Sequence, residues 1–168
     1  MERLILPGFS AKNKIWAEEI KENLGAEIPT VVINWAHWET GQAEKGWIGK
    51  EAEKILQEYE GQKVNLIAKS VGTAVAMAIL RKPNFVDKLI LCGVPLLDLD
   101  DEDKKYYEVL KDFPTDQILC IQNSDDNHGT YEEVKAFLAS INPQIPIITK
   151  PRSDHEYPYP DDFRQFLK

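Results

Sequence analysis

Short apolar runs alternate with longer amphipathic segments along the whole chain. The runs are rich in Val, Ile and Leu and lack the apolar-polar alternation of a half-exposed strand, which is typical of strands that are covered on both faces. The pattern predicts six strands, at residues 4–6, 30–33, 64–68, 88–91, 118–121 and 146–149.

The segments between these runs have the length and spacing of helices. Apolar residues recur every three or four positions in residues 11–23 and 45–59. Asp101 and Thr130 are predicted to be N-terminal caps, and Pro83 is expected to end the helix that begins at Ser70. The strict alternation of strand and helix predicts an α/β domain with a doubly wound, mainly parallel sheet. The remaining helices are predicted at residues 70–80, 101–111, 130–140 and 161–168.

Length and charge narrow the classes of protein that fit this pattern. The 168 residues suit one domain, which we place at residues 1–168, and only residues 96–116 leave room for a short lid. The 20 basic and 28 acidic residues give a formal net charge of −8. This negative charge repels nucleic acid and anionic membranes, so neither is expected as a partner.

The two cysteines and the absence of long apolar segments point to a reducing compartment. Cys92 and Cys120 lie inside apolar runs and are predicted to be reduced core residues, with a disulfide between adjacent strands as the alternative. The first residues lack the features of a signal peptide, and no run approaches the roughly 20 apolar residues of a membrane span. We therefore expect a cytoplasmic protein.

The third predicted strand runs directly into a candidate nucleophile. Residues 64–73 read VNLIAKSVGT, in which a small-x-Ser-x-Gly turn joins the strand to a helix of small residues. Such a turn holds Ser70 in a strained conformation and presents its hydroxyl at a helix N-terminus. The alternative is that Ser70 only caps the helix that follows it.

The order of the other polar residues favours catalysis over capping. A catalytic serine after the third parallel strand requires an acid after a later strand and a histidine after the last one. Asp126 follows the fifth predicted strand, and His155 follows the sixth. A neutral imidazole can take the proton of Ser70, and a carboxylate can fix the tautomer of that imidazole.

Two alternatives to Asp126 stay open. Asp125 is adjacent to it, and only one of the two can face a histidine. Asp126 occupies the fourth place of the turn, which suits the commoner arrangement, whereas ordinary turn chemistry also explains the Asn-Ser-Asp-Asp-Asn-His run. Asp98, after the fourth predicted strand, is a third candidate.

The chain has three histidines, and His155 is favoured among them. His37 follows the second strand, on the far side of the strand of Ser70, and His128 is only two residues from the predicted acid. The alternative for His155 is a surface histidine bonded to Asp154 or Glu156.

The loop after the first strand supplies the remaining part of a hydrolytic site. It reads LPGFS, and the backbone N–H groups of Phe9 and Val71 are expected to face the oxyanion of a tetrahedral intermediate. The glycines of the chain match neither the phosphate-binding nor the dinucleotide-binding spacing, and no paired metal-ligand spacing occurs. No cofactor and no metal are therefore expected.

Two tryptophans follow the second strand. Trp35 and Trp38 are expected to form an apolar wall of a substrate pocket. The alternative is that they pack against the first helix or against Trp47.

The segments LPGFS, NLIAKSVGT, LILCGVP, ILCIQNSDD and SDHEY together resemble the α/β-hydrolase family. The most similar members are small ones without a cap domain, in particular the retinoblastoma-binding serine hydrolase group. The resemblance implies a minimal fold with strand order 2-1-3-4-5-6 and a triad of Ser70, Asp126 and His155. The chain departs from the family at Ala68, where Gly is usual, and at Pro7, where many relatives have His.

These observations predict a serine hydrolase that cleaves a small carboxylic ester or related acyl bond through an acyl-Ser70 intermediate. Thioesters and peptides are cleaved by the same machinery, so the sequence does not separate these substrates. The alternative function is a noncatalytic module that binds a protein or a ligand through the loop of Trp35 and Trp38.

Overall fold

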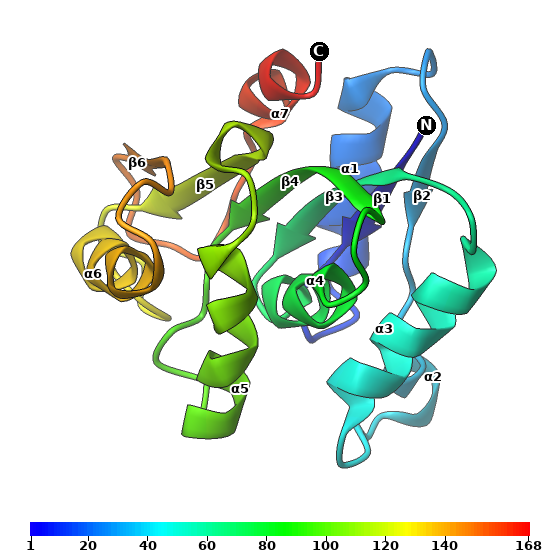
Figure 1. Ribbon diagram of the computed structural model, residues 1–168, viewed down its shortest axis with the longest axis horizontal. Coiled ribbons are helices and arrows are strands. Elements are labelled where there is room, and N and C mark those ends of the chain that lie inside the picture. Colours follow the sequence, from blue (N-terminus) through cyan, green and yellow to red (C-terminus); the bar gives the residue numbers. More distant parts are fainter.

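The computed structural model describes residues 1–168 and contains one six-stranded sheet (Figure 1). All neighbouring strands are parallel, and their order is β2-β1-β3-β4-β5-β6, which confirms the expected topology. The strands are β1 (Glu2–Leu6), β2 (Thr30–Val32), β3 (Val64–Lys69), β4 (Val86–Cys92), β5 (Ile118–Asn123) and β6 (Ile147–Lys150).

Helices cover both faces of the sheet. α1 and α7 pack on one face, and α3, α4, α6 and the 3₁₀ turn at Tyr107–Lys111 pack on the other (Figure 1). The helices are α1 (Asn13–Leu24), α2 (His37–Thr40), α3 (Trp47–Glu58), α4 (Gly72–Leu80), α5 (Asp101–Tyr106), α6 (Tyr131–Ile141) and α7 (Pro160–Phe166), with a second 3₁₀ turn at Thr115–Gln117.

The burial of the central strand β3 explains why its sequence is mostly apolar. All six of its residues are buried. Leu66 and Ala68 point into the larger core beneath α3 and α4, whereas Ile67 points into the smaller core beneath α1 and α7. Because successive side chains of a strand alternate between faces, a strand with two covered faces is mostly apolar, and the two polar residues of β3, Asn65 and Lys69, are buried and hydrogen-bonded.

The helix caps follow the predictions with one shift. Thr130 caps α6 and forms a capping box with Glu133, as the sequence indicates. The cap of α5 is Asp100 rather than Asp101, because the Asp100 carboxylate accepts the N–H of Asp103 at 2.8 Å. The N–H of N3 is the usual partner of an N-cap oxygen, so the cap lies one residue earlier than predicted.

The two cysteines are free and buried. Cys120 belongs to the larger core and Cys92 to the smaller one, on the opposite face of the sheet. Their side chains point in opposite directions, so the alternative of a disulfide does not apply. No helix in the structure combines the length and apolarity that a membrane crossing requires.

Gly72 lets the start of α4 approach the end of β1. A Cβ atom at this position would lie 2.1 Å from the carbonyl oxygen of Leu6 and 2.7 Å from that of Pro7. Both oxygens belong to the backbone, so no side-chain rotation can relieve the clash. The loop after β1 and the turn after β3 therefore meet only because residue 72 has no side chain.

We expect Gly72→Ala to destabilise the fold by about 2–3 kcal/mol, because it forces these two backbone segments apart. Gly49→Ala is the matched control, since Gly49 lies in α3 with nothing within 4 Å of its Cβ position. That substitution should stabilise the protein by about 0.5–1 kcal/mol. Urea denaturation measures both values, and equal effects of the two substitutions would contradict the close approach.

Candidate active site

Ser70 lies in the sharp turn between β3 and α4. Its φ angle is +56°, and only Asn84 shares a positive φ among the residues other than glycine. The N–H of Ser70 donates to the carbonyl of Cys92, 3.0 Å away on the neighbouring strand β4. A positive φ costs a residue with a side chain about 1–3 kcal/mol, and such strain concentrates at functional sites.

Capping does not account for Ser70. The N-cap residue of α4 is Val71, and no side chain donates or accepts a capping hydrogen bond at this helix. The side chain of Ser70 therefore has no structural hydrogen bond to the helix that follows it.

Asp126 and His155 are brought together by the loops after β5 and β6. Nδ1 of His155 lies 2.7 Å from Oδ2 of Asp126, and this carboxylate is buried. The hydroxyl of Tyr157 donates to the same oxygen at 2.5 Å, and the N–H of His128 donates to Oδ1 at 2.8 Å. The carboxylate thus has three protein donors.

The three donors keep Asp126 ionised. Burial alone would raise the pKa of this carboxyl. The hydrogen bonds from His155, Tyr157 and the backbone of His128 together lower the pKa by more than burial raises it, so it lies below the ordinary value. The charged carboxylate accepts the Nδ1–H of His155, so in the neutral imidazole Nε2 is the nitrogen that can accept a proton.

Nε2 of His155 is buried and has no hydrogen-bond partner in the protein. Its ring lies against the end of β4, because a Cβ on Gly93 would be 3.1 Å from Cε1 of His155. Gly93 directly follows Cys92, whose carbonyl accepts the N–H of Ser70. The imidazole and Ser70 therefore flank the same strand end, although no hydrogen bond joins them in this structure.

The other candidate acids have different partners. Asp125 is exposed and accepts the hydroxyl of Ser124 at 2.7 Å. Asp98 lies 2.5 Å from Nδ1 of His128, and the His128 ring packs 4.2 Å from the ring of His155. Of the three acids, only Asp126 contacts His155.

Free backbone N–H groups occur in the loop after β1 and in the turn after Ser70. The N–H groups of Phe9 and Val71 donate to no acceptor in the protein. The carbonyl of Phe9 accepts from Nε2 of His37 and from Nε1 of Trp38, each at 2.7 Å. His37 therefore binds this loop, and it makes no hydrogen bond with Asp126 or His155.

The two tryptophans occupy different environments. Trp38 is partly buried beside Phe9, whereas Trp35 is 1% exposed and packs edge to face against Trp47, with ring centroids 5.7 Å apart. The side chain of Trp35 lies in the hydrophobic core, where its indole N–H bonds the carbonyls of Pro7 and Gly8. That Trp35 and Trp38 form a wall of a substrate pocket stays a prediction.

Two further residues support the site and escaped the sequence analysis. Tyr157, two residues after His155, bonds Asp126. Lys69, just before Ser70, is 2% exposed, and its ammonium group lies 3.0 Å from Asn13 and 3.1 Å from Glu156. The sequence signal that could have identified Lys69 is its charge, which stands alone at the end of an apolar strand. Nothing in the sequence distinguishes Tyr157 from its neighbour Tyr159.

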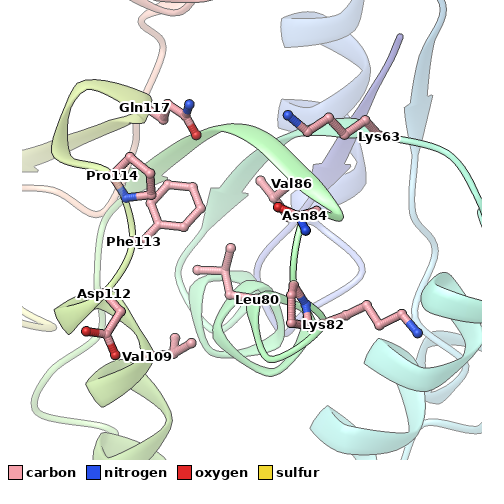
Figure 2. Close-up of a pocket in the computed structure, with 11 residues that line it drawn as sticks. Lys63, Leu80, Lys82, Asn84, Val86, Val109, Asp112, Phe113, Pro114 and Gln117 are labelled. Carbon is pink, nitrogen blue, oxygen red and sulfur yellow. The ribbon is translucent and has the colours of Figure 1, made fainter.

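A cavity of about 470 Å³ lies at the opposite edge of the sheet (Figure 2). Lys63 precedes β3, Val86 begins β4 and Gln117 precedes β5, so the cavity opens at the amino ends of these strands. It is thus separate from Ser70. No group of three or more His, Cys, Asp or Glu side chains is arranged to hold a metal ion.

Comparison with solved structures identifies the fold class. No protein-family model matches the sequence, and no curated protein matches it at the sequence level. The structure is nevertheless similar to many solved structures, and the similarity extends over nearly the whole chain.

Three of these structures are informative. An α/β serine hydrolase without a lid from Xanthomonas campestris aligns with a TM-score of 0.69 and 18% identity, over 99% of this chain and 78% of the other. The ydeN gene product of B. subtilis aligns with a TM-score of 0.69 and 15% identity, over 99% of both chains. A cold-adapted esterase from an Arctic intertidal metagenomic library aligns with a TM-score of 0.64 and 15% identity, over 99% of this chain and 82% of the other. The chain therefore has a minimal α/β-hydrolase fold.

We expect Tyr157→Phe to destabilise the protein more at neutral pH than in acid. The low folded-state pKa of Asp126 contributes stability above its unfolded pKa, and this contribution is lost as pH falls through the folded value. Removing one donor reduces that contribution by about 1.5–3 kcal/mol at pH 7. Below the folded pKa, the carboxyl is protonated in both proteins, so this part of the difference disappears.

Urea denaturation at pH 7 and at successively lower pH measures the effect. Tyr159→Phe is the control, because the hydroxyl of Tyr159 donates to the neutral side chain of Asn123. Its cost should be the same at every pH. A Tyr157→Phe penalty that does not change with pH would show that the hydroxyl does not stabilise a charged Asp126.

Proposed function

We propose that this protein is a serine hydrolase that cleaves a small carboxylic ester or related acyl bond through an acyl-Ser70 intermediate. The observation that carries the proposal is the state of His155: Nδ1 bonds the buried carboxylate of Asp126, and Nε2 is free beside the strained turn of Ser70. Ser70 is the nucleophile, His155 the general base and Asp126 the orienting acid.

In the acylation step, the proton of the Ser70 hydroxyl passes to Nε2 of His155 as Oγ attacks the substrate carbonyl carbon. The ionised Asp126 stabilises the imidazolium that forms and does not take up the proton. The carbonyl oxygen becomes an oxyanion, for which the free N–H groups of Phe9 and Val71 are the proposed donors.

The tetrahedral intermediate collapses when His155 gives its proton to the leaving alcohol. Water then attacks the acyl-enzyme and loses its proton to His155, and Ser70 is released when it regains that proton. No step in this sequence requires a metal ion or an organic cofactor.

Several features support an ester as the substrate. The fold is shared with a lid-less serine hydrolase and with an esterase, and the loop after β1 exposes half of Phe9 beside Trp38. An apolar rim suits a small uncharged acyl group. The matching segments further support a place near the retinoblastoma-binding serine hydrolase group. Cys92 and Cys120, which cannot pair, support a cytosolic location.

A fluorophosphonate probe should label the wild-type protein at Ser70, and Ser70→Ala should abolish the labelling. Ser124→Ala is the matched control, because the hydroxyl of this half-buried serine bonds only the side chain of Asp125 and the backbone of Arg152. Hydrolysis of p-nitrophenyl acetate should fall about 10⁴-fold in Asp126→Asn, because the imidazole then adopts the wrong tautomer.

Mass spectrometry of the labelled peptide and a spectrophotometric ester assay give the two results. If folded wild-type protein is neither labelled nor active on esters, thioesters and peptides, the hydrolase proposal is wrong. The protein would then be a noncatalytic binding module on this fold.

A further inference from the structure

The two proposed oxyanion donors belong to two peptide groups, Gly8–Phe9 and Ser70–Val71. In a trans peptide the carbonyl and the N–H point in opposite directions. A donor that binds the carbonyl oxygen therefore fixes the orientation of the peptide plane, and with it the direction of the N–H at the opposite edge of the peptide. Each of these two carbonyls is bound by a donor from the protein core.

Trp35 binds the first peptide. Its indole Nε1–H lies 3.1 Å from the carbonyl oxygen of Gly8 and 3.1 Å from that of Pro7. The indole is 1% exposed and is packed against Trp47, so it has little freedom to move. The N–H of Phe9, on the opposite side of the Gly8–Phe9 peptide, has no protein acceptor.

A two-residue relay binds the second peptide. The hydroxyl of Thr73 donates to the carbonyl of Ser70 at 2.6 Å, beside the backbone N–H of Thr73, which donates to the same oxygen at 2.9 Å. The Thr73 hydroxyl also contacts the hydroxyl of Tyr107. Because the single proton of Thr73 is used on Ser70, Tyr107 must be the donor in the second bond. Burial raises the pKa of Tyr107, which keeps its hydroxyl protonated. The N–H of Val71 again has no protein acceptor.

We infer that Trp35 and the Tyr107–Thr73 pair are positioning residues for catalysis. They bind the carbonyl groups of the two peptides whose N–H groups are the proposed oxyanion donors. The inference rests on the proposed function. The hydrogen bonds act in two ways: they fix the plane of each peptide, and they polarise it so that its N–H becomes a stronger donor. Preorganised donors stabilise the transition state because they need no reorientation as charge develops.

The contact between the two loops makes the arrangement possible. Gly72 places the start of α4 against the carbonyls of Leu6 and Pro7, so the two peptides belong to adjacent segments. The inference also gives residues 96–116 a role other than that of a lid. Tyr107 is fully buried within this segment, and its hydroxyl is linked through Thr73 to the peptide after the nucleophile.

The test uses three substitutions that remove one donor each: Trp35→Phe, Thr73→Val and Tyr107→Phe. Each should lower kcat on p-nitrophenyl acetate about 10- to 100-fold with little change in KM, because the lost interaction acts on the transition state. Phe85→Leu and Tyr59→Phe are the matched controls, since neither Phe85 nor Tyr59 makes a side-chain hydrogen bond, and both belong to the same core. Their kcat should stay close to that of the wild type.

A trifluoromethyl ketone separates positioning from general loss of stability. Ser70 Oγ adds to the ketone carbon, its proton passes to His155, and the resulting oxyanion occupies the same place as that of the ester intermediate. The inhibition constant should rise by the same factor by which kcat falls in each variant. A merely structural substitution lowers the fraction of folded protein and leaves the inhibition constant of the folded fraction unchanged.

An amide spectrum of ¹⁵N-labelled protein tests the hydrogen bonds without any activity. The ¹⁵N resonance of Phe9 should move upfield in Trp35→Phe and stay in place in Phe85→Leu. The resonance of Val71 should move in Thr73→Val and in Tyr107→Phe, and stay in place in Tyr59→Phe.

The outcomes are distinguishable. Shifted resonances together with lowered kcat and weaker ketone binding support the inference. Unshifted resonances, or a kcat that falls no more than in the matched controls, overturn it even if the wild type is an active hydrolase. If the wild-type protein is not labelled by the fluorophosphonate probe, the proposed function fails, and the positioning role fails with it, whatever the resonances show.

Discussion

The close approach of two backbone segments, the end of β1 and the start of α4, is the constraint on which the rest of the site depends. A residue larger than glycine at position 72 would collide with the carbonyl of Leu6. With that approach in place, the strained turn at Ser70 and the loop of Phe9 share one edge of the sheet. The strain at Ser70 is offset elsewhere, because β3 is buried along its whole length and pairs with a strand on each side.

The electrostatics of the site follow from a second constraint, the burial of Asp126. A buried carboxylate is unfavourable unless its lone pairs are filled by donors. Here the donors come from the loop after β5 and the loop after β6. The bonds that make the buried charge tolerable are therefore the same bonds that orient His155. Lys69 also links the start of α1 to the loop of His155, because its ammonium group bonds both Asn13 and Glu156.

The sheet and the order of the chemical groups could be predicted from the sequence, because both depend on local patterns. Strands buried on two faces read as apolar runs, and parallel order puts the loops of Ser70 and His155 at one edge. The contacts between distant segments could not be predicted. Trp35 lies in a polar-flanked loop, yet the carbonyls that it binds come from 27 and 28 residues earlier. The choice between Asp125 and Asp126 likewise depends on the direction of one turn, which composition does not encode.

The small size of the chain explains why its support residues lie in the core. Six strands and their helices use most of the 168 residues, so few residues of this chain lie outside the fold and could hold its loops from there. The segment at 96–116 illustrates the consequence: Leu99, Tyr107 and Leu110 are buried, and this segment contributes to the larger core. In this chain the loops of Ser70 and Phe9 are bound from within the fold, by side chains that serve packing and hydrogen bonding together. Its stability and the geometry of the candidate site are therefore expected to be sensitive to the same few core residues.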